Sequence, residues 1–176
     1  MGVAELSAER FRTILDAMAR PGKILSLNAD PPEDLSPAQA AIAMTLIDAT
    51  QQVWVTRQTS ELADWFGFHT GTRPQLKLEK ADFVFATPDD FDALDACRIG
   101  NDEYPDQSAT IIMELPELTN EGATLTGPGI ETKASLSLPE LAFFQRNMAL
   151  FPLGLDFMLT CGTQIACLPR STKVEG

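Results

Sequence analysis

FPLGLDFMLTCGTQIACLPRSTKVE, residues 151–175, places two short apolar runs on either side of a tight turn at Cys161-Gly162-Thr163. Apolar runs joined through a glycine turn are typical of a β-hairpin. We expect its packing residues to be Leu155, Phe157, Leu159, Ile165, Ala166 and Leu168.

The same stretch ends in the cations and hydroxyls of residues 170–173, Arg-Ser-Thr-Lys. A planar guanidinium beside hydroxyl groups suits phosphate recognition. A charged chain end that frays into solvent has the same composition. Both interpretations stay open from the residues alone.

The first fifty residues predict two helices separated by a short strand at 23–27. In the first helix, apolar residues follow helical spacing after Ser7, and Pro21-Gly22 stops it. The second begins at Pro37, where Ser36 can cap and Gln39 can complete a capping box. This alanine-rich helix is apolar on most sides, so we expect it to be buried as far as about Asp48.

The rest of the chain alternates between strand and helix patterns. Strands are expected at 53–56, 82–86, 109–115 and 123–129, and helices at 60–68 and 139–150, with an acidic helix between the second and third of these strands. The sequence therefore predicts an α/β fold, a mixed β-sheet flanked by helices, in a single domain covering 1–176.

The net charge of −12 and the isoelectric point near 4.4 leave no basic footprint for nucleic acid or for anionic lipid. We therefore expect neither nucleic acid nor a membrane surface as a partner. Residues 89–106 hold seven acids against Arg98, a net charge of −6. This stretch is either a solvated helix face followed by an exposed loop, or a docking surface for a basic partner.

Three scattered cysteines, Cys97, Cys161 and Cys167, form no C-x-x-C pair, and two of them lie in or beside apolar runs. They are expected to be inert core or turn residues. No apolar run reaches the length of a signal peptide or of a membrane-spanning helix, so we expect a cytoplasmic protein. A single histidine, His69, argues against a multi-histidine metal site, and we expect no metal.

Candidates for chemistry are few. Gly127 and Gly129, in LTGPGIETKA, could turn backbone N–H groups toward an anion, or could simply form a strand-to-loop turn. His69, expected just beyond its helix, could exchange protons near neutral pH or cap that helix. Asp156, at the start of an apolar strand, needs a cap or a salt bridge to a nearby arginine. No nucleophile elbow and no marked Schiff-base lysine is found.

Taken in order, several segments resemble one family, PhnH, the H subunit of the bacterial carbon–phosphorus lyase system for phosphonate breakdown. The similarity spans nearly the whole chain, and the C-terminal segment is its most specific part. The matching segments are FRTILDAMARPG (11–22), MTLID with VWV (44–55), FHTG (68–71), ADFVFA (81–86), LTGPGI (125–130) and FPLGLDFMLTCG…LPRSTKVE (151–175).

The resemblance implies an α/β fold similar to the large domain of pyridoxal-phosphate-dependent transferases, without the cofactor. It implies a subunit that works with the G, I and J subunits, supports formation of α-D-ribose 1-alkylphosphonate 5-triphosphate from ATP and a phosphonate, and is a homodimer when isolated. It assigns no catalytic residue. Six residues inside the matching segments are our candidates for a ligand or subunit contact: His69, Gly127, Gly129, Asp156, Arg170 and Thr172.

The alternative is a protein that acts alone, as a phosphate- or phosphonate-binding protein or a small-molecule enzyme. Gly127, Gly129 and Arg170 would then hold the anion.

Overall fold

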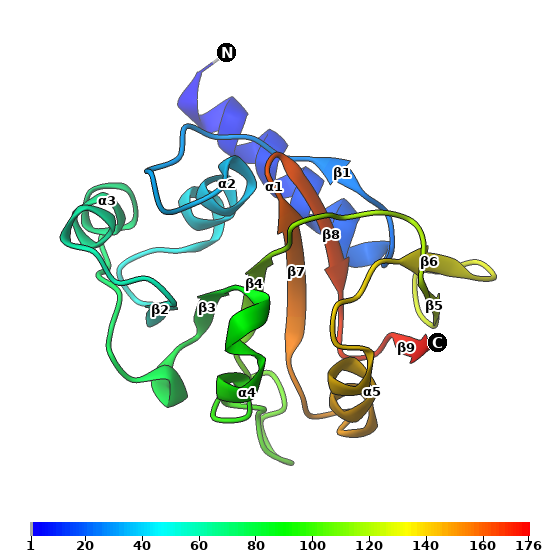
Figure 1. The fold of residues 1–176 in the computed structure, drawn as a ribbon. Helices are drawn as coiled ribbons and strands as arrows, with labels where there is room; N and C mark the ends of the chain where they lie inside the picture. Colours follow the sequence, from blue (N-terminus) through cyan, green and yellow to red (C-terminus); the bar gives the residue numbers. More distant parts are fainter. Residues whose placement is uncertain (1) are drawn as a thin grey trace.

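The computed structural model describes residues 2–176 and contains a mixed six-stranded sheet (Figure 1). The strand order is β1 (Leu25–Ser26), β8 (Gln164–Leu168), β7 (Asp156–Cys161), β4 (Thr110–Glu114), β3 (Phe83–Ala86) and β2 (Val53–Val55). The strands from β2 to β7 are parallel, whereas β8 and β1 are antiparallel to their neighbours. The predicted α/β fold with a mixed sheet is confirmed.

Three helices cover one face of this sheet: α1 (Val3–Ala19), α2 (Pro37–Leu46) and α3 (Ser60–Thr70). Ser36 caps α2 in a capping box with Gln39, and the alanines of α2 are almost fully buried, as expected. The predicted continuation of this helix to about Asp48 is wrong. Ile47 is extended, and Asp48 instead accepts a hydrogen bond from the backbone N–H of Thr50 at 2.7 Å.

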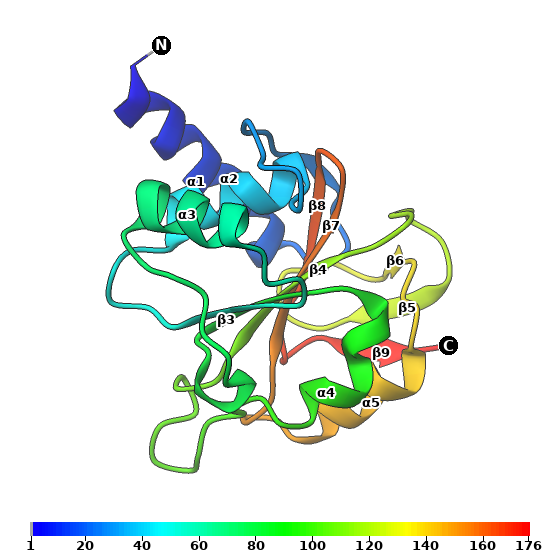
Figure 2. The same ribbon diagram turned by 60° about the vertical axis from the view of Figure 1, so that its left-hand side comes forward.

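The opposite face carries helices η2 (Pro88–Asp90), α4 (Phe91–Leu94) and α5 (Leu141–Ala149) and a small antiparallel sheet (Figure 2). The order in the small sheet is β6 (Ala134–Leu136), β5 (Ala123–Thr126) and β9 (Lys173–Glu175). A further short helix, η1 (Leu78–Lys80), precedes β3. The core on this side centres on four phenylalanine rings whose neighbouring centroids lie 4.9–6.0 Å apart: Phe91, Phe143, Phe144 and Phe157.

The predicted closing hairpin is confirmed as β7 and β8, with Gly162 in the turn at φ +58°. Successive residues of a strand point to opposite faces. Accordingly, Phe157 and Leu159 join the core beneath α5, while Met158 joins the core beneath α1 and α2. The six predicted packing residues of this hairpin are all buried.

Other boundaries depart from the sequence pattern. β5 ends at Thr126 because Gly127 and Gly129 adopt positive φ and turn the chain, so the strand expected to reach Gly129 is shorter. Helix α5 begins at Leu141 and not at Pro139. Strands β6 and β9 were not expected, since each is three residues long and gains its stability from pairing with β5.

Three of the edge strands, β2, β6 and β9, are bonded by other parts of the chain, and the fourth, β1, is only two residues long. Val53 of β2 accepts a backbone hydrogen bond from Gln75. Gln145 and Met148 of α5 bond to the backbone of Val174 in β9, and the Asn120 amide bonds to Ser135 in β6. Covered edges resist pairing with strands from other molecules. Within residues 2–176, no helix is both long and apolar enough to cross a bilayer.

Replacing Phe157 with alanine should lower the free energy of unfolding by about 3–5 kcal/mol, because a fully buried ring would leave a cavity beside the rings of Phe143 and Phe144. Phe68 is 85% exposed, so Phe68→Ala should change it by less than about 0.5 kcal/mol. Urea denaturation of both variants measures the difference. Equal effects would contradict the assigned core.

Candidate functional site

Arg170 and Asp156 form an ion pair where β7 begins and β8 has just ended. The Arg170 backbone N–H and its Nε atom donate to Oδ1 of Asp156 at 2.8 and 3.2 Å, and Nη2 donates to Oδ2 at 2.6 Å. The side chains are 14% and 24% exposed. The interpretation of Asp156 as an acid satisfied by a nearby arginine is confirmed.

The remaining donors of Arg170 are also used inside the protein. Nη1 donates to the carbonyl oxygen of Pro105 at 2.6 Å, and Nη2 donates to the Ser108 hydroxyl. The guanidinium therefore fastens the loop between Ile99 and Ser108 to the end of the sheet. Because the donors of its guanidinium are already directed at acceptors within the protein, Arg170 is poorly placed to bind an additional anion.

The C-terminal tail after Arg170 is ordered. Thr172 is 1% exposed and its backbone N–H donates to Pro169, while Lys173–Glu175 pair with β5 as strand β9. The interpretation of this tail as a frayed, solvated end is therefore wrong. The tail leaves the hairpin and becomes an edge of the second sheet, which requires pairing with residues about fifty positions earlier.

Gly127 and Gly129 shape a turn against the rest of the chain. A Cβ at Gly129, where φ is +81°, would lie 2.0 Å from the carbonyl oxygen of Ala19 at the end of α1. A Cβ at Gly127 would lie 3.2 Å from the carbonyl oxygen of Ser171. These close approaches explain both glycines as packing residues. The strand-to-loop interpretation accounts for them without a bound anion.

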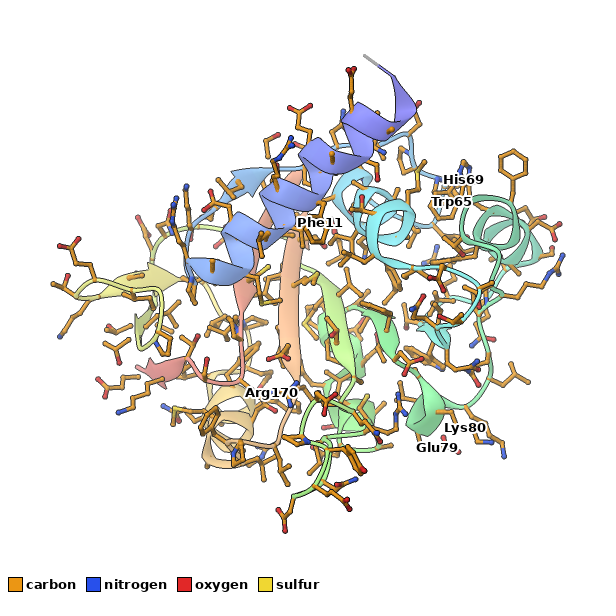
Figure 3. The ribbon with its side chains drawn as sticks, turned by 180° about the vertical axis from the view of Figure 1, so that it is seen from behind. Phe11, Trp65, His69, Glu79, Lys80 and Arg170 are labelled. Atoms are coloured by element: carbon orange, nitrogen blue, oxygen red, sulfur yellow. The ribbon has the colours of Figure 1, made fainter. Side chains whose placement is uncertain are left out.

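His69 lies inside the last turn of α3, so the predicted position beyond the helix is wrong. Helix α3 continues to Thr70 because Gly71, at φ +78°, supplies the left-handed residue that ends it. The exposed His69 ring lies 4.6 Å from Trp65 and 4.9 Å from Phe68, centroid to centroid. Figure 3 shows His69 and Arg170 at well separated places, so the six candidates do not form one site.

Glu114, the last residue of β4, is a half-buried polar centre that was not among the expected site residues. Its Oε2 accepts hydrogen bonds from the Ser36 and Thr160 hydroxyls, both at 2.6 Å, and its Oε1 accepts one from the Gly162 N–H at 2.8 Å. One carboxylate thus joins the start of α2, the strand β7 and the turn of the hairpin. The available signal was an acid ending an otherwise apolar strand.

Glu114 borders a cleft of about 360 Å³ at the carboxyl ends of β2, β3 and β4. Ligands of open α/β sheets bind at this edge. Here the polar groups are largely satisfied by one another, because Asp34 pairs with Arg57 at 3.2 Å and accepts from Thr59 at 2.9 Å. The surplus of acids makes the cleft unsuited to a phosphate. Within the described part of the chain, no group of three or more potential metal ligands is found.

Comparison with known proteins identifies the family. Residues 3–175 match the family model described as bacterial phosphonate metabolism protein (PhnH). The chain belongs to the PhnH family. Among curated PhnH relatives, it is 36% identical to the alpha-D-ribose 1-methylphosphonate 5-triphosphate synthase subunit PhnH of Rhizobium meliloti (strain 1021), over 94% of this chain and 88% of the relative. It is 32% identical to the putative C-P lyase subunit protein HtxG of Stutzerimonas stutzeri, over 94% and 84%.

The three thiols of this PhnH family member are unpaired and differ in access. Burial, followed by the nearby Asp95 charge, raises the pKa of Cys97 to about 12. Burial raises the pKa of Cys167 even further, and it also raises the pKa of the half-buried Cys161, together with Glu114 and Glu117. The thiolate is the reactive form, so all three should react slowly in the folded protein.

We expect a disulfide-exchange reagent at pH 8 to modify Cys161 first and to leave Cys97 and Cys167 unmodified until the protein unfolds. Mass spectrometry of timed samples, with a sample in denaturant as the control, identifies the order. Rapid labelling of Cys167 in the native protein would contradict its assigned burial.

Arg170→Met should lower the free energy of unfolding by about 3 kcal/mol, because it leaves the largely buried Asp156 carboxylate without its partner. Adding Asp156→Asn should restore part of the loss. Arg73→Met is the matched control, since its pair with Asp64 is about 70% exposed on both sides and should contribute less than about 1 kcal/mol. Denaturant unfolding measures all of them, and equal losses for Arg170→Met and Arg73→Met would refute this account.

Proposed function

We propose that this chain is a subunit of the bacterial carbon–phosphorus lyase system. In that role it supports formation of α-D-ribose 1-alkylphosphonate 5-triphosphate from ATP and a phosphonate, without carrying the active site. The observation that carries the proposal is the PhnH family match over residues 3–175, together with a 36% identical relative that is named as a subunit of the synthase.

The arrangement of the reactive side chains supports a non-catalytic role. Arg170 is engaged by Asp156 and by the loop that ends at Ser108, and Glu114 is engaged by three donors from three elements. Groups held this way stabilise the fold and have little freedom to meet a substrate. Arg170 and Asp156 then serve subunit contacts indirectly, by positioning the loop that they hold.

The proposal includes finer expectations. We expect the G, I and J subunits as partners, a homodimer when the chain is isolated, a cytoplasmic location, and one domain covering 1–176. The helix-flanked mixed sheet is compatible with a fold like the large domain of pyridoxal-phosphate-dependent transferases without the cofactor. Exposed His69, beside the 85% exposed Phe68, is the candidate best placed for direct subunit contact.

Co-expression with the G, I and J subunits tests the proposal. We expect this chain to co-purify with them through affinity and sizing columns, and we expect product formation from ATP and methylphosphonate to fall when it is omitted and to recover on its return. A chain that never co-purifies would refute the proposal.

The alternative, a binding protein that acts alone, is tested on the isolated chain. Titration calorimetry with ATP and with methylphosphonate should give no binding heat at 1 mM ligand, where a dissociation constant of about 1 mM corresponds to about −4 kcal/mol. Saturable heat with either ligand would favour the alternative.

A further inference from the structure

A groove lies between α4 and α5. Figures 1 and 2 place both helices at the same end of the molecule. The groove consists of two hollows of about 260 and 320 Å³ that share Asp95, Phe143 and Arg146. We define this α4–α5 groove by Asp89, Asp92 and Asp95 on one wall and by Glu140, Phe143 and Arg146 on the other.

The charges along the groove are not neutralised inside the chain. No ion pair and no side-chain hydrogen bond among residues 2–176 involves the carboxylates of Asp89, Asp92, Asp95 or Glu140. Arg146 lies over the Phe143 ring at 5.4 Å, so one cation faces four acids. The groove therefore carries a net charge of about −3 and attracts cationic groups.

The floor and one end of the groove are apolar. Phe91 and Leu94 lie at its base, and Leu150, which is 43% exposed, borders it. The next residue, Phe151, is 60% exposed. Charged side chains beside exposed apolar residues are the combination that protein–protein interfaces use.

We propose that the α4–α5 groove docks a segment of another subunit that carries lysine or arginine side chains around an apolar anchor. The anchor packs against Leu150 and Phe151, and the cations pair with Asp92 and Asp95. This inference rests on the proposed function as a complex subunit. It names the surface and the partner chemistry that assembly would use.

The occupant is a different chain and not a second copy of this one. In a symmetric dimer the same patch faces itself, and two grooves of net negative charge would repel each other. Strand addition is a poor alternative mode of docking, since Gln75, Asn120 and α5 bond to the edge strands β2, β6 and β9, and the remaining edge strand β1 is only two residues long. A phosphate-bearing partner is disfavoured by the same negative charge.

The test measures by interferometry how tightly the purified chain binds to an immobilised subcomplex of the G, I and J subunits. The double variant Asp92→Lys with Asp95→Lys should raise the dissociation constant at least tenfold, because both side chains are exposed and face the cations. The matched control, Glu79→Lys with Glu131→Lys, makes the same charge change on two exposed acids that do not line the groove, and it should change the dissociation constant less than twofold. Raising the salt concentration should weaken subcomplex binding of the wild-type chain more than that of the charge-reversed groove variant.

A second pair of variants examines the apolar anchor. Leu150→Ser with Phe151→Ser should also weaken binding at least tenfold, whereas Leu15→Ser with Leu76→Ser, at residues that are 56% and 85% exposed, should have a smaller effect. Circular dichroism and thermal unfolding establish that each variant is folded, and Asp92→Asn with Asp95→Asn provides a milder change of charge.

The outcomes separate the two proposals. If the wild-type chain does not bind the subcomplex, the proposed function fails and the inference fails with it. If the wild type binds and both groove variants bind within twofold of it, the function stands and the inference is wrong. If instead the groove variants change the oligomeric state of the isolated chain without affecting subcomplex binding, the groove is a contact between copies, and the inference is again overturned.

Discussion

The structure depends on the pairing of β7 between β4 and β8. Strand β7 is hydrogen-bonded on both edges and buried on both faces, with a parallel neighbour on one side and an antiparallel one on the other. A backbone in this position leaves no polar group unpaired, and its alternating side chains supply both cores of the molecule. The phenylalanine cluster beneath α5 and the apolar layer beneath α2 are therefore linked through one six-residue strand.

The return of β8 along β7 has a second consequence, because it brings Arg170 beside Asp156. The ion pair fixes the direction in which the chain leaves the large sheet, and it also holds the loop through Pro105 and Ser108. From there the tail crosses to β5, so the last residues close the second sheet. A pair that is largely shielded from water is suited to such positioning, since its partners are costly to separate.

The charged side chains fall into two groups, those paired inside the chain and those exposed on its surface. Arg170, Asp156 and Glu114 are satisfied within the chain. Asp89, Asp92 and Asp95 are exposed, and their carboxylates have no side-chain partner among the described residues. A subunit of an assembly requires a rigid scaffold and a surface that other chains can recognise. In this PhnH family member, Arg170, Asp156 and Glu114 belong to the scaffold, whereas His69, the exposed acids and the exposed apolar residues belong to the surface.

The sequence by itself determined the local elements and the family. Apolar spacing and the Ser36–Gln39 capping box were sufficient for α2, and the apolar runs around Gly162 were sufficient for the hairpin, because these signals act over a few residues. Only the tertiary structure decided the rest. The strands β6 and β9, the contacts of Glu114 with Ser36 and Gly162, and the separation of His69 from Arg170 depend on segments far apart in the chain. A carboxylate or a guanidinium looks the same in a sequence whether it faces solvent or a partner, and its role is set by what folding brings within hydrogen-bond distance.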